Sequence, residues 1–282
     1  MTHTIDTFKK NHDYIVCIDS DGTAIDAMNV KHKKCHGPSF IDVWGLDAHR
    51  EEVQKMWDEI NLYSKDRGVN RFIALIKILK QLDGKYLDAK EDIAALEDWE
   101  RTTKGLSNKY LKEEIAKTGN ETLKKALRFS ELLNKRIGEL TFDDKPPFEG
   151  VKEGLEYMKN YADIAIVSSS NLEAIQSEWD YYGLLDYVDV LTSQEVGTKG
   201  QCISRLLSLG YNPEKVLMMG DAYPDTEAAE ANGVWYYPIM TNREKESWDN
   251  LRNKYFKIFT DGNYRDVQAK LITDFEENFK KI

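Results

Sequence analysis

Four carboxylates that could do chemistry stand in two short segments of this chain. Asp19 and Asp21 lie two residues apart in Asp-Ser-Asp-Gly-Thr, and Asp221 and Asp225 lie four residues apart in Gly-Asp-Ala-Tyr-Pro-Asp. Each segment directly follows a run of mostly apolar residues with the character of a buried strand. Acidic side chains gathered in one place repel one another unless a cation lies between them. Oxygen ligands without Cys or His favour Mg²⁺, so the two segments predict a magnesium site.

Three serines follow another apolar run. Ser168 and Ser169 come directly after it, and Ser170 has Glu173 three residues further on, in the spacing of a capping box. We therefore expect Ser168 and Ser169 at the mouth of a helix, where hydroxyls and unpaired N–H groups suit an anion such as phosphate. The alternative is that these serines only cap the helix.

A lysine occupies an unusual place in a further segment, between the serines and Asp221. The sequence Thr198-Lys199-Gly200-Gln201 has the spacing of a second capping box, with Lys199 in the first turn of the expected helix. A cation at that end of a helix opposes the helix dipole unless an anion lies nearby. Lys199 is therefore either a ligand for an anion or a solvated surface lysine.

Strands must bring these segments together, and the second half of the chain alternates strand and helix patterns. This alternation is typical of a parallel sheet that helices cover on both faces. The apolar run 14–18 must join the same sheet, whose carboxyl edge is where open α/β sheets bind ligands. We predict the α/β class, with a Rossmann-like doubly wound parallel sheet. The expected strands are 14–18, 164–167, 188–191, 216–219 and 234–237, and the expected helices are 150–160, 171–181, 199–209 and 225–232.

Helical patterns fill the chain from about residue 48 to residue 138, and nothing there reads as a strand. Apolar residues recur in this region at helical spacing. The sequence Asp143-Asp144-Lys145-Pro146-Pro147 ends the region, because paired prolines stop helices and stiffen connections. We predict an inserted all-helical domain at 28–143, and a core that combines residues 1–27 with residues 144–282.

Composition and charge argue against several classes of protein. The 282 residues include 49 acidic and 39 basic side chains, and the net charge of −10 opposes binding to nucleic acid. No apolar run approaches the ~20 residues of a membrane span, and residues 1–13 read as a polar lead-in without a signal-peptide pattern. The three cysteines are far apart, which argues against a disulfide framework. We expect a cytoplasmic protein with no nucleic-acid or membrane partner.

Taken in order, the four segments resemble the motifs of the haloacid dehalogenase-like hydrolase superfamily. The first segment matches its D-x-D-G-T motif, from Asp19 to Thr23. Ser168 matches the second motif, Lys199 fits the third, and Gly220-Asp221 with Asp225 fits the G-D-x-x-x-D form of the fourth. The position of the helical insertion matches a C1-type cap domain.

The resemblance implies a catalytic role for four residues. Asp19 would be the nucleophile that forms an aspartyl-phosphate. Asp21 would protonate the leaving oxygen and then activate water. Ser168 and Lys199 would hold the transferring phosphoryl group.

The same resemblance implies the ligands around these four residues. Ser169 would join Ser168 and Lys199 in binding phosphate, and Thr23 would support the loop. Mg²⁺ would be bound by Asp19, by the backbone carbonyl of Asp21 and by Asp221. Asp225 would orient Lys199 or a metal-bound water.

The activity that follows is Mg²⁺-dependent hydrolysis of a phosphomonoester, with a small phosphorylated metabolite as substrate. Asp21 favours phosphate esters, because family members that cleave carbon–halogen or carbon–phosphorus bonds typically lack this second acid. A phosphomutase of the β-phosphoglucomutase type would use the same two aspartates and remains an alternative. A non-catalytic ligand-binding protein on the same fold is a third. The sequence predicts neither the particular ester nor the oligomeric state.

The helical insertion should set the specificity of the enzyme. Arg67 and Arg71 stand beside Gly68 in a connection between helices, and we expect one of them to contact an anionic part of the substrate. The basic run 31–36 could line the entrance to the site or could be a solvated face. Tryptophans usually bury their large rings, so those of this region are expected in its core: Trp44, Trp57 and Trp99.

Overall fold

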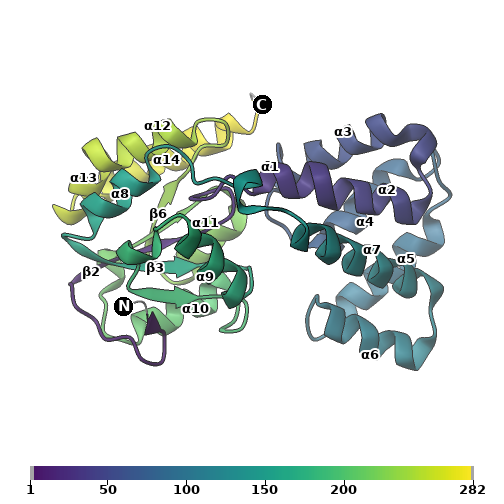
Figure 1. The fold of residues 1–282 in the computed structure, drawn as a ribbon, viewed down its shortest axis with the longest axis horizontal. Helices are drawn as coiled ribbons and strands as arrows, with labels where there is room; N and C mark the ends of the chain where they lie inside the picture. Colours follow the sequence, from purple (N-terminus) through teal and green to yellow (C-terminus); the bar gives the residue numbers. More distant parts are fainter. Residues whose placement is uncertain (1–2, 281–282) are drawn as a thin grey trace. The chain divides into compact units, whose positions relative to one another are not determined.

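The computed structural model describes residues 3–280 of the chain (Figure 1). Contacts divide the chain into two compact units. One unit combines Met1–Ala27 with Phe142–Ile282 and contains the sheet, whereas the other, Met28–Thr141, is helical. This arrangement confirms the predicted helical insertion into an α/β fold.

Within residues 3–280, six parallel strands form one sheet in the order β1-β4-β3-β2-β5-β6. The strands are β1 His3–Thr4, β2 Tyr14–Ile18, β3 Ala162–Val167, β4 Val190–Thr192, β5 Val216–Gly220 and β6 Trp235–Pro238. Ile18, the last residue of β2, lies opposite Ile166 of β3 and Met219 of β5. These three strands therefore end at nearly the same level, and the segments that follow them meet at one edge of the sheet.

Four helices of this unit match the predicted ones to within two residues at each end. They are α8 Val151–Met158, α9 Leu172–Tyr181, α10 Lys199–Leu207 and α11 Tyr223–Ala231, and α12 Glu244–Asn250, α13 Phe256–Thr260 and α14 Arg265–Asn278 follow. Short 3₁₀ turns at Phe142–Asp144, Leu185–Tyr187 and Pro213–Lys215, and a π-helical turn at Leu251–Tyr255, complete the unit.

Each face of the sheet has its own apolar core, because successive side chains of a strand point to opposite faces. Val16 and Ile18 pack with residues of α8, α9, α12 and α13 on one face. Ile15 and Cys17 pack with residues of α10 and α11 on the other. Both faces are therefore covered, and this explains why the strands read as continuous apolar runs.

The N-terminal segment corrects the prediction of a polar lead-in. β1 pairs with β4 at one edge of the sheet, and Ile5 and Phe8 are each only 5% exposed in the core. The backbone N–H groups of Asn11 and His12 then donate to a carboxylate oxygen of the buried Asp163, at 2.9 Å each. Two apolar residues among polar neighbours carry no periodicity, so the sequence pattern could not reveal this packing.

The helical unit has an apolar core of its own. Its elements are α1 Met28–Val30, a π-helix at Lys31–His36, α2 Gly37–Trp44, a 3₁₀ turn at Asp47–His49, α3 Arg50–Asn61, α4 Arg71–Leu82, α5 Lys90–Thr102, α6 Asn108–Thr118 and α7 Glu121–Gly138. Trp44, Trp57 and Trp99 are buried in this core, as predicted. In the basic run, Lys33 and Lys34 are exposed.

Across residues 3–280 no helix has the length and apolar character that crossing a membrane requires.

Replacing Phe8 with alanine tests whether the N-terminal segment belongs to the core. We expect Phe8→Ala to lower the free energy of unfolding by about 3–5 kcal/mol, because a fully packed ring leaves a cavity. The neighbouring Lys9 is exposed, so Lys9→Ala should change that energy by no more than about 0.5 kcal/mol. Denaturant unfolding of both variants measures the difference, and equal stability would contradict the burial of Phe8.

Candidate active site

The loop after β2 places Asp19 at the centre of the sheet edge. The backbone N–H of Asp19 still donates to the carbonyl of Met219 in β5, at 3.0 Å. The chain then turns sharply, because the carbonyl of Ser20 accepts from the N–H of Ala24 at 3.0 Å. Gly22 has a φ of +86° in this turn, a conformation that side-chain-bearing residues rarely adopt.

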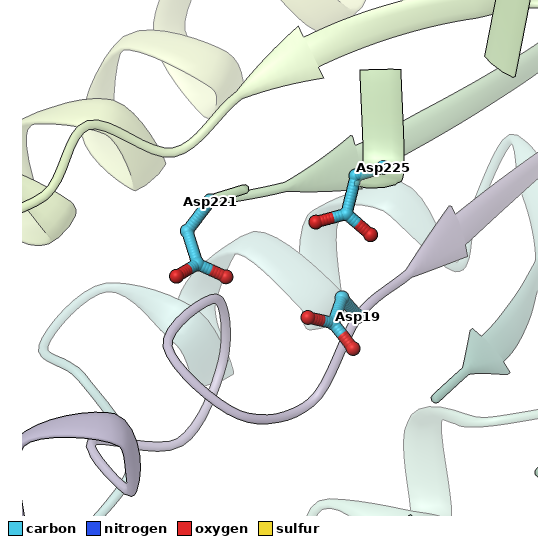
Figure 2. A group of neighbouring side chains, drawn as sticks. All are labelled: Asp19, Asp221 and Asp225. Atoms are coloured by element: carbon cyan, nitrogen blue, oxygen red, sulfur yellow. The ribbon is translucent and has the colours of Figure 1, made fainter. Parts of the chain in front are cut away.

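Three carboxylates from two segments of the chain converge on one place. Figure 2 shows Asp19, which follows β2, facing Asp221, which follows β5, and Asp225 of α11. One oxygen of each lies within 4.8 Å of the other two, and all three side chains are buried. Asp221 also accepts a hydrogen bond of 2.8 Å from the hydroxyl of Thr23.

Lys199 stands among these carboxylates. It is the first residue of α10, and its Nζ lies 3.0 Å from Oδ2 of Asp19 and 2.6 Å from Oδ1 of Asp225. Thr198 caps the helix in the predicted capping box, since its hydroxyl accepts from the N–H of Gln201. Burial by itself lowers the pKa of Lys199, but the two carboxylates raise it above its ordinary value, so the side chain is an ammonium ion.

Negative charge exceeds positive charge in this cluster. Burial raises the pKa of Asp19 well above its usual range; Lys199 opposes that rise, while Asp225 and Asp221 add to it. Burial raises the pKa of Asp225 as well, with Lys199 again opposing and Asp221 adding. A single ammonium does not balance three buried carboxylates, and oxygen donors without nitrogen or sulfur suit a hard divalent cation. The residues present therefore fit a metal site.

Both oxygens of the Asp225 carboxylate have partners within the protein. Its Oδ1 binds Lys199, and its Oδ2 accepts from the N–H of Ala222 at 3.2 Å. Its carboxylate also packs directly against Gly220, where a Cβ atom would lie 2.2 Å from Cγ of Asp225. Asp225 is thus placed to hold Lys199, and Gly220 is the residue that leaves room for it.

The serine loop after β3 lies beside Asp21. Ser168 is buried, and its Oγ accepts from the N–H of Ser170 at 3.2 Å. The hydroxyl of Ser170 is 3.4 Å from Oδ2 of Asp21, which is partly exposed, and Ser169 is exposed. The structure thus brings Asp21 to the serine loop.

The predicted capping role of Ser170 is wrong. Asn171 is the N-cap of α9, and its Oδ1 accepts from the N–H of Ala174 at 2.8 Å. Ser and Asn both favour the N-cap, so local preference could not choose between two neighbouring candidates. The helix consequently begins one residue later than a Ser170 cap would place it, and the hydroxyl of Ser170 is turned to Asp21 instead.

Two buried tryptophans support the Asp19–Thr23 loop, and neither was predicted from the sequence. Nε1 of Trp179 in α9 donates to the hydroxyl of Ser20 at 2.9 Å. Nε1 of Trp248 in α12 donates to the carbonyl of Thr23 at 2.9 Å. They lie 159 and 225 positions away from their acceptors, so no local pattern could have indicated them.

Arg67 and Arg71 belong to the helical unit. Arg67 is only 1% exposed and donates from Nη1 to the carbonyl of Leu62 at 3.1 Å. Arg71 donates from Nη1 to the hydroxyl of Ser130 at 3.1 Å and to Oδ1 of Asn134 at 2.5 Å. Burial lowers the pKa of Arg71, and these two acceptors are neutral groups.

Comparison with known proteins bears on the whole arrangement. A family model described as haloacid dehalogenase-like hydrolase matches residues 15–233, which is more than half of the chain. No curated protein matches. Among solved structures, a predicted phosphatase from Clostridium acetobutylicum has 13% identity and a TM-score of 0.51, covering 88% of this chain and 99% of that one. A hydrolase from Pseudomonas syringae has 13% identity and a TM-score of 0.50, covering 83% and 90%. At these identities the likeness concerns the fold.

Replacing Gly220 with alanine tests the close approach of Asp225. We expect Gly220→Ala to lower the free energy of unfolding by about 1–3 kcal/mol, because the added methyl group overpacks a rigid site. A Cβ atom at Gly138, the last residue of α7, would meet nothing within 4 Å, so Gly138 is the matched control. Gly138→Ala should be neutral or stabilising by up to about 1 kcal/mol. Equal effects of the two changes, measured by thermal unfolding, would contradict this close approach.

Proposed function

We propose that this chain, which belongs to the haloacid dehalogenase-like hydrolase family, hydrolyses phosphomonoesters of small metabolites with Mg²⁺ as its cofactor. The observation that carries the proposal is the convergence of Asp19, Lys199 and Asp221 at the carboxyl ends of β2 and β5. A nucleophile, a phosphate-binding cation and a metal-binding carboxylate are the groups that phosphoryl transfer to an enzyme needs.

The first half of the proposed reaction uses both aspartates of the β2 loop. A carboxylate oxygen of Asp19 attacks phosphorus in line with the ester oxygen, so that a bond forms to Asp19 and the P–O ester bond breaks. The leaving oxygen takes a proton from the carboxyl group of Asp21. Partial exposure of Asp21 and its contact with Ser170 support this role, because an acid must reach the leaving group.

The second half removes the phosphoryl group from Asp19. Asp21, now a carboxylate, takes a proton from a water molecule as the oxygen of that water attacks phosphorus. The bond between phosphorus and Asp19 breaks, the free carboxylate of Asp19 returns, and inorganic phosphate leaves. The proton that Asp21 gave to the leaving group is thereby restored.

The remaining residues of the site bind and neutralise charge. Asp19, Asp221 and the backbone carbonyl of Asp21 would hold Mg²⁺. When bound, the ion supplies positive charge that offsets the repulsion between a carboxylate nucleophile and a phosphate dianion. We assign three groups to the phosphoryl oxygens: Lys199, Ser168 and Ser169. Thr23 assists phosphate binding indirectly, by supporting the loop. Asp225 orients Lys199, and their 2.6 Å contact supports that assignment.

We further propose that the helical unit, residues 28–143, is a cap that selects the substrate. Arg71 is the better supported of the two arginines, because it is a partly buried cation whose hydrogen bonds go to neutral acceptors. An anionic group of the substrate would balance its charge. Arg67 would take part from the neighbouring turn.

Hydrolysis of p-nitrophenyl phosphate tests the proposed activity. We expect turnover that requires Mg²⁺, is lost on adding EDTA, and falls by about 10³-fold or more in Asp19→Asn, because this change removes the nucleophile. Asp266 is exposed in α14, so Asp266→Asn is a control that should retain wild-type activity.

If the wild type hydrolysed neither this compound nor any member of a panel of natural phosphate esters, the proposed activity would be refuted. Activity that appears only with a bisphosphorylated activator would identify a phosphomutase instead.

Substitution of Arg71 tests its proposed contact with the substrate. We expect Arg71→Met to raise KM about tenfold for esters that carry a second anionic group, with kcat retained, because a uniform binding interaction is lost. Arg101 is highly exposed and pairs with Asp98 three residues away, so Arg101→Met is the matched control and should leave KM unchanged. Unchanged constants for Arg71→Met over the whole panel would exclude the contact.

A further inference from the structure

Helix α9 contacts two different segments of the chain through neighbouring residues. Trp179 donates to Ser20 in the Asp19–Thr23 loop, at 2.9 Å. Glu178 lies 2.7 Å from Nζ of Lys145, which stands in the linker 142–148 that returns from the helical unit. The helix therefore contacts two segments. One carries the catalytic aspartates, and the other is the linker 142–148, which follows the helical unit.

The contact with the loop is buried on both sides. Ser20 is 1% exposed and Trp179 is fully buried, so neither partner can exchange its hydrogen bond for one with water. Ser20 stands between Asp19 and Asp21, and its carbonyl accepts the turn hydrogen bonds from Ala24 and from Ile25. The hydrogen bond from Trp179 to Ser20 therefore restricts the motion of the segment that contains both carboxylates.

The contact with the linker is more than one ion pair. The side chains of Lys145 and Glu178 are only 12% and 6% exposed. The ring of Phe142 stacks on Tyr181 with 4.5 Å between centroids, and the hydroxyl of Tyr182 donates to the carbonyl of Phe142. The start of the linker thus packs against the C-terminal half of α9 and its C-cap residue, Tyr182.

The linker is also joined to the chain that leaves the catalytic loop. The carbonyl of Pro146 accepts from the N–H of Asp26 at 2.8 Å, and Pro147 forms an antiparallel bridge with Ile25. The segment that leads into the helical unit, at residues 25–26, is thereby paired with the segment that returns from it, at residues 146–147. A displacement of the linker can therefore reach the catalytic loop by two routes. One is the pairing of residues 146–147 with residues 25–26, and the other is α9.

We propose that α9 couples the linker to the catalytic loop, with Trp179 as a positioning residue and the Lys145–Glu178 pair as its connection to the linker. The proposal rests on the proposed hydrolytic function, because the loop in question carries Asp19 and Asp21. Trp179 does not touch the reacting atoms. It sets the position of the two carboxylates, and the ion pair sets the position of Trp179.

A double-mutant cycle tests this coupling. Trp179→Phe keeps an aromatic ring and removes the N–H donor, and Glu178→Gln removes the charge that binds Lys145. We expect each change to lower kcat about tenfold with KM nearly unchanged, since misplaced catalytic groups slow the chemical step. The double variant should lose no more than the worse single variant, which is the signature of two residues that act on one element.

The chain offers a matched control for the indole. Trp235 in β6 donates from Nε1 to the carbonyl of Glu214 at 2.9 Å, away from the catalytic loop. Trp235→Phe should leave kcat unchanged, alone and combined with Glu178→Gln. If Glu178→Gln does not fold, Lys145→Met removes the same ion pair from its other side.

Hydrogen–deuterium exchange gives a readout that needs no activity. The amides of Ala24 and Ile25 are protected by their bonds to Ser20, so a loosened loop should exchange faster in a peptide that spans residues 19–25. We expect faster exchange of this peptide in Trp179→Phe and in Glu178→Gln, but not in Trp235→Phe.

Two outcomes would overturn the coupling: losses in kcat that multiply in the double variant, or unchanged exchange of this peptide in the single variants. If the wild type hydrolysed no phosphate ester, the proposed function would fail and the exchange experiment alone would decide the coupling.

Discussion

The structure depends on one electrostatic arrangement, in which the ammonium of Lys199 lies between the carboxylates of Asp19 and Asp225. Burying a charge without a partner is costly, and here two buried carboxylates share one cation while a third, that of Asp221, lies within 4.8 Å of both. Other features follow from this arrangement. The capping box of Thr198 starts α10 where Lys199 reaches the site, and Gly220 lets the carboxylate of Asp225 approach the backbone. The excess of negative charge is what makes a divalent cation chemically suitable here.

The parallel sheet and the position of the candidate site follow from local sequence, because each acidic or hydroxyl segment directly succeeds an apolar run. Strands buried on both faces must be apolar throughout, and polar residues are tolerated only where the strand ends. Asp19 and Asp221 could therefore be placed at one edge without any knowledge of the contacts. The roles of the individual side chains have a different source, since they were inferred from a family resemblance rather than from local pattern.

The parts that could not be predicted depend on contacts distant in sequence or on a choice between equivalent neighbours. Ile5 and Phe8 are buried only because β1 pairs with β4, which is formed by residues 190–192. Asn171 and Ser170 are both good helix caps, and the structure uses Asn171. The indole N–H of Trp179 has a specific acceptor only because α9 packs beside the loop, 159 positions away in the sequence. Tertiary packing decides such positions.

The central position of β2 in the sheet has a consequence for how this chain is made. β2 is formed by residues 14–18, yet its two neighbours are β3 at 162–167 and β5 at 216–220. At a synthesis rate of about 5–20 residues per second, this apolar strand waits roughly 10–40 seconds for its second partner to leave the ribosome. The helical unit, whose contacts are local, can fold during that interval. Until then, the nascent chain exposes a hydrophobic strand that lacks a partner, on the N-terminal side of a folded helical domain. Chaperones bind intermediates of this kind.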